Sequence, residues 1–276
     1  MEDTAIDIPQ LKKSTGRLSS NTLKLIAIAA MLIDHIAWAF VPTLSPLGQV
    51  MHIIGRTTAP IMCYFIAEGY YHTRSVKKYA LRLFVFAVIS YLPFVLFETH
   101  GLPTVQTFLT LNVIYTLFLG LLALWAWDKM ENAVLRVLVV IGLCILAMPG
   151  DWMYYDVLWV LLFGIYHGDF KKQMCSFTVI ALIMAATSSL PYLMMNLAVQ
   201  NPATAPAVYA SLKQLGITSV PPVYSQFFQL GVFLALPLLS LYNGKRGGGK
   251  YDKWIFYIFY PTHLLIIALL RIYVIK

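Results

Sequence analysis

Charged residues are scarce in this sequence. They make up 12% of its 276 residues, whereas hydrophobic residues make up 59%. Soluble domains contain about 25% charged and roughly 45–50% apolar residues, so this chain requires lipid as its solvent. At about 20 residues for each membrane-spanning helix, its length accommodates roughly eight to ten spans. We therefore expect a single membrane domain and no appended soluble domain.

Several familiar motifs are absent as well. The sequence contains no HExxH pair, GxSxG turn, P-loop or CxxC pair, so the key chemistry of metalloproteases, serine hydrolases and ATPases is missing. The three cysteines, Cys63, Cys144 and Cys175, lie in or beside apolar segments, where we expect them to pack and not to form disulfides. Residues 1–20 are polar and lack the apolar core of a signal peptide, which predicts a cytoplasmic N-terminal segment.

Nine apolar runs fill most of the remaining chain. They predict an all-α polytopic membrane protein, in which about nine transmembrane helices form one bundle within residues 21–276. The sixth run is short and only residues 149–151 separate it from the fifth, so a re-entrant or tilted pair of helices stays open there. The runs lie at about 21–43, 47–71, 78–98, 108–127, 133–149, 153–167, 174–198, 223–242 and 253–275.

Basic residues predict the orientation of these helices. They gather in alternate loops, whereas the other loops contain a single lysine, Lys213. Cytoplasmic loops carry such an excess of Lys and Arg, so the N-terminus is expected on the cytoplasmic side of the membrane. The net charge of +8 then reflects topology, and no nucleic-acid partner is expected. The basic loop residues include Lys12, Lys13, Arg17, Arg74, Lys77, Lys78, Lys129, Arg136, Lys171, Lys172, Lys245, Arg246, Lys250 and Lys253.

Ionisable residues inside the first run are the first candidates for chemistry. Insertion of a charged side chain at mid-membrane costs about 2.5–3.5 kcal/mol, so such a residue needs a partner inside the protein and is a candidate functional residue. Asp34 and His35 are adjacent and point about 100° apart on a helix. A histidine titrates near neutral pH, which suits a general base. A purely structural hydrogen bond between helices is the alternative for His35.

The second run carries further charged groups. His52 and Arg56 lie one turn apart, and we expect Arg56 to pair with Asp34 or Glu68, although such a pair could serve only to fix helix register. Glu68 and His72 are also one turn apart and lead toward the predicted cytoplasmic end. The segment GYYHTRSVKK would form a basic mouth there that attracts nucleotide phosphate, and topology alone also explains its charge.

Two more polar residues stand in later runs. His263 follows Pro261 in YIFYPTHLLII, and a proline inside a helix frees a carbonyl group, which is typical of helices that line a cavity. Asn112 lies near the external end of the fourth run, where an interhelical hydrogen bond is an equally simple role. Asp151 and Asp156 fall at the predicted external interface, where acidic residues are ordinary.

Five segments in order resemble one family. LKLIAIAAMLIDHI, GRTTAPIMCYFIAEGYYHTRS, LNVIYTLFLGLLAL, YYDVLWVLLFGIYHG, and YNGKRG followed by FYPTHLLII are similar to segments of the TraX proteins and cover most of the chain from about residue 21 to 270. The resemblance implies N-terminal acetylation of a pilin subunit in the inner membrane. Acetyl-CoA would be the donor, and no metal is implied.

The TraX family is in turn similar to a wider group of transmembrane acyltransferases. Their first span carries a basic residue, ten intervening residues and a catalytic histidine, and Lys24 and His35 have this spacing, with Lys in place of the usual Arg. Along a helix the two residues are about 16 Å apart, which is roughly the reach of an extended pantetheine arm. The resemblance thus implies that Lys24 lies at the cytoplasmic surface and His35 deep in the membrane.

A mechanism follows from this resemblance as a hypothesis. His35, oriented by Asp34, would take a proton from the acceptor, and Arg56, Asn112 or His263 would stabilise the oxyanion. The acceptor would be a pilin-like or other secreted or membrane molecule, with an amine or a hydroxyl group. The residues expected to bind acetyl-CoA are Lys24, Glu68, His72, Arg74, Lys77, Lys78, Arg82, Lys245, Arg246 and Tyr260.

Two other classes of function remain open from the sequence. Buried Asp, His, Arg and Glu residues also form proton relays in transporters. A non-catalytic protein that assembles pilin helices in the bilayer is the second alternative, but it would need neither a deep ionisable group nor acetyl-CoA.

Overall fold

The computed structural model describes residues 16–217, 219–249 and 252–274. Most of the predicted N-terminal segment, including Lys12 and Lys13, lies outside the described residues, as do Lys250 and the side chain of Lys253. Helices make up all of the long regular segments in the described part, as the apolar runs predicted. In order they are α1 (Ser20–Phe40), α2 (Pro46–Gly55), α3 (Thr58–His72), α4 (Val76–Thr99), α5 (Val113–Lys129), α6 (Ala133–Leu146), α7 (Met153–Ile165), α8 (Phe170–Gln200), α9 (Pro206–Gln214), the 3₁₀ helix η1 (Val223–Leu234), α10 (Ala235–Ser240) and α11 (Asp252–Val274).

Six helical stretches in the described residues are long and apolar enough to cross a membrane. They are α1, α2 with α3, α4, α8, η1 with α10, and α11. The chain is therefore a multi-pass membrane protein. The fourth, fifth and sixth runs form the shorter helices α5, α6 and α7, which contain 17, 14 and 13 residues. At 1.5 Å per residue they span roughly 20–26 Å, less than the ~30 Å hydrocarbon core.

The second apolar run is interrupted, where the sequence predicted one continuous helix. Arg56 and Thr57 separate α2 from α3, and the Thr57 hydroxyl donates to the Ile54 carbonyl oxygen over 2.8 Å. Two nearby residues account for the break. Gly55 is a weak helix former, and Pro60 has no backbone N–H to continue the helical bonding. The interruption places Arg56 at a helix junction, inside the protein.

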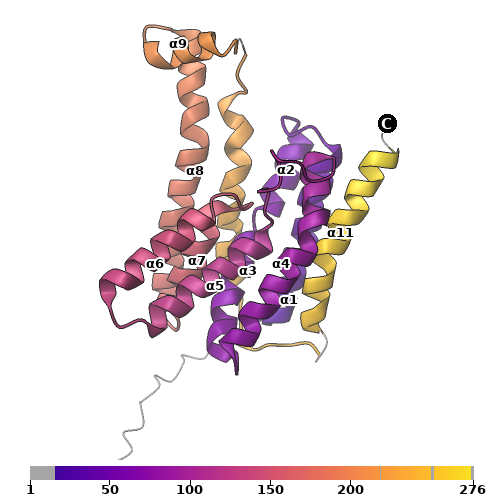
Figure 1. The fold of residues 1–276 in the computed structure, drawn as a ribbon, viewed down its shortest axis with the longest axis vertical. Helices are drawn as coiled ribbons and strands as arrows, with labels where there is room; N and C mark the ends of the chain where they lie inside the picture. Colours follow the sequence, from indigo (N-terminus) through magenta and orange to yellow (C-terminus); the bar gives the residue numbers. More distant parts are fainter. Residues whose placement is uncertain (1–15, 218, 250–251, 275–276) are drawn as a thin grey trace, which may run out of the picture.

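The helices form one bundle with an extension (Figure 1). α1 packs against α2, α3 and α11, while α4 packs against α5 and α11, and α5 lies against α7. Phe163 of α7 stacks on Phe177 of α8, and Trp159 packs against the same ring at a tilt, which joins α8 to the core. Beyond this contact α8 and η1 run side by side, η1 also packs against α2, and α9 lies at the far end of α8.

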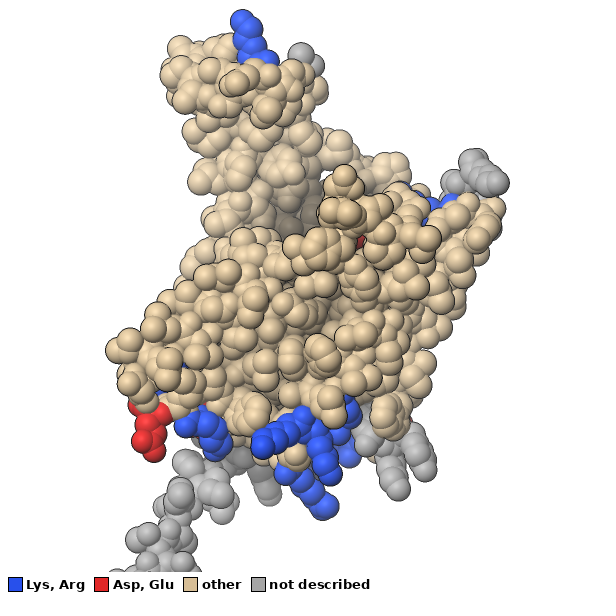
Figure 2. All heavy atoms as spheres, in the orientation of Figure 1, with Lys and Arg blue, Asp and Glu red and all other residues tan. Residues whose placement is uncertain are grey.

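Lys and Arg side chains gather at one end of the molecule. Figure 2 shows them at the end where α4 begins, in agreement with the alternate loops that the sequence predicted to share one side. We call this the basic end and define it by Arg74, Lys77, Lys78, Lys171, Lys172, Lys245 and Arg246.

Candidate functional site

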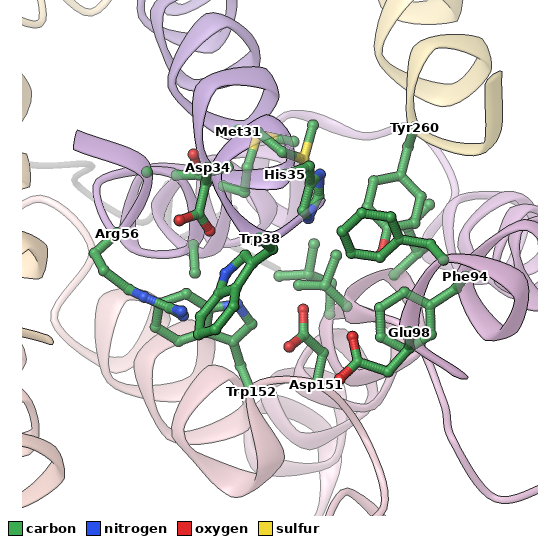
Figure 3. Close-up of a pocket in the computed structure, with 18 of the residues that line it drawn as sticks. Met31, Asp34, His35, Trp38, Arg56, Phe94, Glu98, Asp151, Trp152 and Tyr260 are labelled. Carbon is green, nitrogen blue, oxygen red and sulfur yellow. The ribbon is translucent and has the colours of Figure 1, made fainter. Parts of the chain in front are cut away.

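A cavity of about 370 Å³ lies between α1, the α2–α3 junction, α4 and the loop before α7. We call it the histidine cavity. Figure 3 shows polar side chains that come from all of these elements. It is lined, among others, by Asp34, His35, Trp38, Arg56, Glu98, Asp151, Trp152 and Tyr260. Three residues that the sequence singled out for catalysis, Asp34, His35 and Arg56, are thus brought together.

His35 is held by a second histidine. Its Nδ1 lies 2.7 Å from Nε2 of His263, and both side chains are buried. Nδ1 of His263 lies 2.8 Å from the carbonyl oxygen of Phe259, which is only an acceptor, so this nitrogen carries the proton. In neutral rings His263 Nε2 is then an acceptor and His35 Nδ1 a donor. This order leaves Nε2 of His35 unprotonated, as a general base requires.

Asp34 contacts a different histidine from the one that the sequence predicted. Its Oδ1 accepts a hydrogen bond from Nδ1 of His52 over 2.7 Å, and His52 is fully buried against Trp38. The expected contact in which Asp34 orients His35 is replaced by two separate pairs, because neighbouring residues on a helix point about 100° apart and reach different partners. Orientation of His35 comes from His263 on α11.

Arg56 lies among aromatic rings and not in the predicted ion pair. Its guanidinium lies 4.9 Å from the ring centroids of both Trp152 and Phe228 and 5.9 Å from that of Trp38. No carboxylate oxygen of the described residues is within ion-pair distance of it, and its buried Nε has no hydrogen-bond partner there. A cation held by ring faces keeps its N–H groups available for a negatively charged ligand atom.

The close approach of α1 and α2 behind the site depends on Gly55. A Cβ at this position would overlap the Asp34 side chain, with Oδ1 only 2.6 Å away. We expect Gly55→Ala to destabilise the protein by about 1–3 kcal/mol, because the helices must separate to relieve the overlap. Thermal unfolding in detergent measures this loss. The control is Gly142→Ala in α6, where no atom lies within 4 Å of the new Cβ and helix propensity favours alanine. Equal unfolding temperatures for the two variants would contradict the prediction.

Two acidic residues that the sequence did not place in the site also line the histidine cavity. Figure 3 shows the carboxylates of Glu98 and Asp151 pointing into it. Loss of hydration among the surrounding groups raises the pKa of Asp151 to about 7, although the positive charge of Arg56 opposes the shift. The sequence pattern treated Asp151 as an ordinary interface acid, because the loops that fold over α4 are distant in sequence.

Asn112 has a local role in the structure. Its Oδ1 accepts hydrogen bonds from the backbone N–H groups of Ile114 and Tyr115 and so caps α5. Its Nδ2 donates to the carbonyl oxygen of Ala87 over 2.8 Å. Asn112 is 1% exposed and is not among the residues that line the histidine cavity, so its amide is committed to joining α4 and α5.

A second cavity, of about 570 Å³, has Arg246 of the basic end in its lining. We call it the basic cavity. Five residues predicted to bind acetyl-CoA line it, which are Lys24, Glu68, His72, Arg82 and Arg246. The ammonium group of Lys24 lies 5.0 Å from the ring centroid of Phe65, and this cation–π contact holds the charged group at the wall of the cavity.

The remaining predicted acetyl-CoA residues lie elsewhere. Tyr260 lines the histidine cavity, one residue before the proline of α11. The other four belong to the exposed surface of the basic end and are not among the residues that line the basic cavity. They are Arg74, Lys77, Lys78 and Lys245.

The two cavities adjoin each other. Met62, Ile114 and Leu117 line both of them. Lys24 and His35, which share one helix, therefore line different cavities that have these apolar side chains in common. A flexible methionine at such a boundary can adopt other rotamers at little cost.

The sequence is similar to that of known proteins. A family profile described as TraX protein matches residues 19–271. The probable fimbrial assembly protein FimC, serogroup H1, of Dichelobacter nodosus is 31% identical over 255 residues, which cover 91% of this chain and 94% of that protein. The uncharacterized protein RP591 of Rickettsia prowazekii (strain Madrid E) is 31% identical over 98 residues, which cover 36% of this chain and 33% of that protein. No solved structure matches the chain.

Proposed function

The chain belongs to the TraX family, and on this premise we propose that it is a membrane-embedded acetyltransferase. It would move the acetyl group of cytoplasmic acetyl-CoA to an amine or hydroxyl acceptor on the other side of a bacterial inner membrane. The observation that carries the proposal is the pair of adjoining cavities, one basic and one containing His35 with an unprotonated nitrogen.

The basic cavity suits the nucleotide part of acetyl-CoA. Phosphate groups are bound by Arg and Lys side chains, and Arg82, Arg246 and Lys24 line this cavity. Its mouth lies at the end of the molecule that carries most of the basic residues, which the positive-inside rule assigns to the cytoplasm. The pantetheine arm would pass Met62, Ile114 and Leu117 and place the thioester beside His35.

The group transfer can be written with its atoms balanced. The acceptor nitrogen attacks the thioester carbonyl carbon, and Nε2 of His35 takes the proton that the nitrogen loses. The tetrahedral adduct carries a negative oxygen, which the available N–H groups of Arg56 would stabilise. The C–S bond then breaks and the thiolate receives the proton from His35, which yields the acetylated acceptor and free CoA. Since His263 already bonds His35, Arg56 is the better oxyanion donor.

A pilin-like acceptor is favoured by the relatives. The Dichelobacter nodosus protein is named as a probable fimbrial assembly protein, and it is matched along 94% of its length. A pilin-like subunit that is anchored in the bilayer by an apolar helix could present its N-terminus to the histidine cavity. The proposed substrate is therefore the amino group of a membrane-anchored subunit.

Acetyl-CoA is expected to stabilise the detergent-purified protein in a dose-dependent manner. A ligand at 100 times its Kd stabilises the native state by about 2.7 kcal/mol, which raises the unfolding temperature. Arg82→Ala and Arg246→Ala should each weaken the shift, because these side chains line the basic cavity. Lys213→Ala, on α9 at the opposite end, is the matched control and should leave the shift unchanged.

A negative result has a definite meaning. If millimolar acetyl-CoA produces no shift in protein shown to be folded, the acetyltransferase proposal fails. A proton-coupled transporter would then be the better hypothesis, because the ionisable groups that line two adjoining cavities also suit a proton path.

A further inference from the structure

Three metal-ligating side chains meet beside the mouth of the basic cavity. Glu68 and His72 are on α3, and His167 lies in the turn between α7 and α8. His167 Nε2 is 3.1 Å from Glu68 Oε1, and His72 Nε2 is 3.5 Å from Glu68 Oε2. The ligand atoms of all three residues lie within 4.8 Å of one another. The sequence showed only the Glu68–His72 half of this cluster.

The distances between these atoms fit a shared metal ion. Zinc binds histidine nitrogen and carboxylate oxygen at about 2.0–2.2 Å in tetrahedral geometry, which places neighbouring ligand atoms roughly 3.3–3.5 Å apart. A charge-assisted hydrogen bond is shorter, at about 2.7–2.9 Å. The His72–Glu68 distance of 3.5 Å equals the separation that a metal imposes, whereas the His167–Glu68 distance of 3.1 Å also fits a direct hydrogen bond. From this geometry we propose that Glu68, His72 and His167 bind one divalent ion of the zinc class.

The cluster is preorganised on its inner side. The ring of His167 stacks on Tyr71 with centroids 4.0 Å apart, and the Tyr71 hydroxyl donates to the Gly164 carbonyl oxygen over 2.9 Å. Gly168 follows with a φ of +89°, which allows the tight turn that presents His167. Contacts of this kind hold a metal ligand in its binding orientation before the ion arrives.

The outer side of the cluster is open. The His72 side chain is 66% exposed, whereas that of His167 is 21% and that of Glu68 is 15% exposed. A zinc ion with three protein ligands keeps one coordination position for water or an anionic oxygen. Glu68 and His72 line the basic cavity, so this position would face it and could take a phosphate oxygen. The site extends the proposed function but does not depend on it.

Zinc binding can be measured without acetyl-CoA or an acceptor. The full-length protein in detergent is treated with a chelator and titrated with Zn²⁺ by calorimetry, and Co²⁺ is added to report tetrahedral coordination by absorption. We expect one ion per chain. Glu68→Gln and His167→Ala should weaken binding at least about tenfold, since loss of a ligand costs no less than loss of a supporting contact. His100→Ala, at the end of α4, is the matched histidine control.

The outcomes separate clearly. One-to-one binding that the cluster variants lose and the His100→Ala variant keeps supports the site. Absence of saturable binding in folded protein overturns it, as does equal binding in Glu68→Gln and the native chain. His72 is largely exposed, so His72→Ala should fold even if Glu68→Gln or His167→Ala does not. This variant must also weaken zinc binding. The result is independent of whether the chain transfers acetyl groups.

Discussion

A His35→Ala variant is expected to lose about 10²–10⁴-fold in kcat for acetyl transfer. General-base catalysis contributes a factor of this size, and His35 is the buried group whose free nitrogen can take the acceptor's proton. The measurement is release of CoA thiol by the protein in vesicles that contain a pilin subunit. Mass spectrometry of the subunit's N-terminus confirms that the acetyl group has moved.

Binding must be separated from chemistry in this experiment. His35→Ala should still show the thermal shift with acetyl-CoA, because the residues that bind the nucleotide lie in the other cavity. Ile36→Ala is the matched control, since Ile36 is the next residue on α1 and lies on its exposed side. Full turnover by folded His35→Ala would remove His35 from the mechanism.

Replacement of His263 by phenylalanine should also reduce kcat strongly, by about 10²–10³-fold. Phenylalanine fills the space but offers no acceptor to Nδ1 of His35, so that ring can rotate or change tautomer. The orienting acid of a serine protease triad shows how large such an effect can be, since its loss costs about 10⁴-fold through the wrong tautomer. KM for acetyl-CoA should change little, because His263 is not among the residues that line the basic cavity.

A glutamine at the same position tests whether His263 acts through His35. The amide oxygen of His263→Gln can accept the hydrogen bond from His35, so this variant should recover part of the lost kcat. A merely structural role predicts that His263→Phe has the higher kcat of the two variants, because phenylalanine preserves the stacked packing on Phe259 better than glutamine does. If glutamine is as inactive as phenylalanine while both variants fold, the proposed hydrogen-bond order is wrong.

Local sequence signals predicted some features of the site and missed others for identifiable reasons. The spacing of Lys24 and His35 was read from the chain. The binding role of Lys24 and the catalytic role of His35 stay predictions. The break between α2 and α3 was missed although Gly55 and Pro60 indicate it, because hydrophobic residues continue on both sides of the junction. Asn112 was considered for catalysis as a polar residue inside the fourth apolar run, but the helix begins only at the next residue, so Asn112 is its cap.

By itself, the sequence determined that the chain needs a lipid environment, and it predicted which loops lie at the same end. Scarcity of charge and long apolar runs predict helices in lipid. A helix satisfies all its backbone hydrogen bonds within one segment, so it can cross a bilayer that offers no water as a partner. The alternate placement of Lys and Arg predicted which loops share an end, and the basic end of the structure agrees. These properties follow from composition and order along the chain, so they need no knowledge of which helix contacts which.

Only the tertiary structure decided the partners of the ionisable groups. His35 meets His263, 228 residues away, and Asp34 meets His52, whereas the sequence had joined Asp34 to His35. His167 joins Glu68 from a separate helix pair. Buried polar groups must find partners at hydrogen-bond distance, and helix packing sets those distances to within tenths of an ångström. Periodicity along one helix cannot supply that information, because it describes a face and not what the face touches.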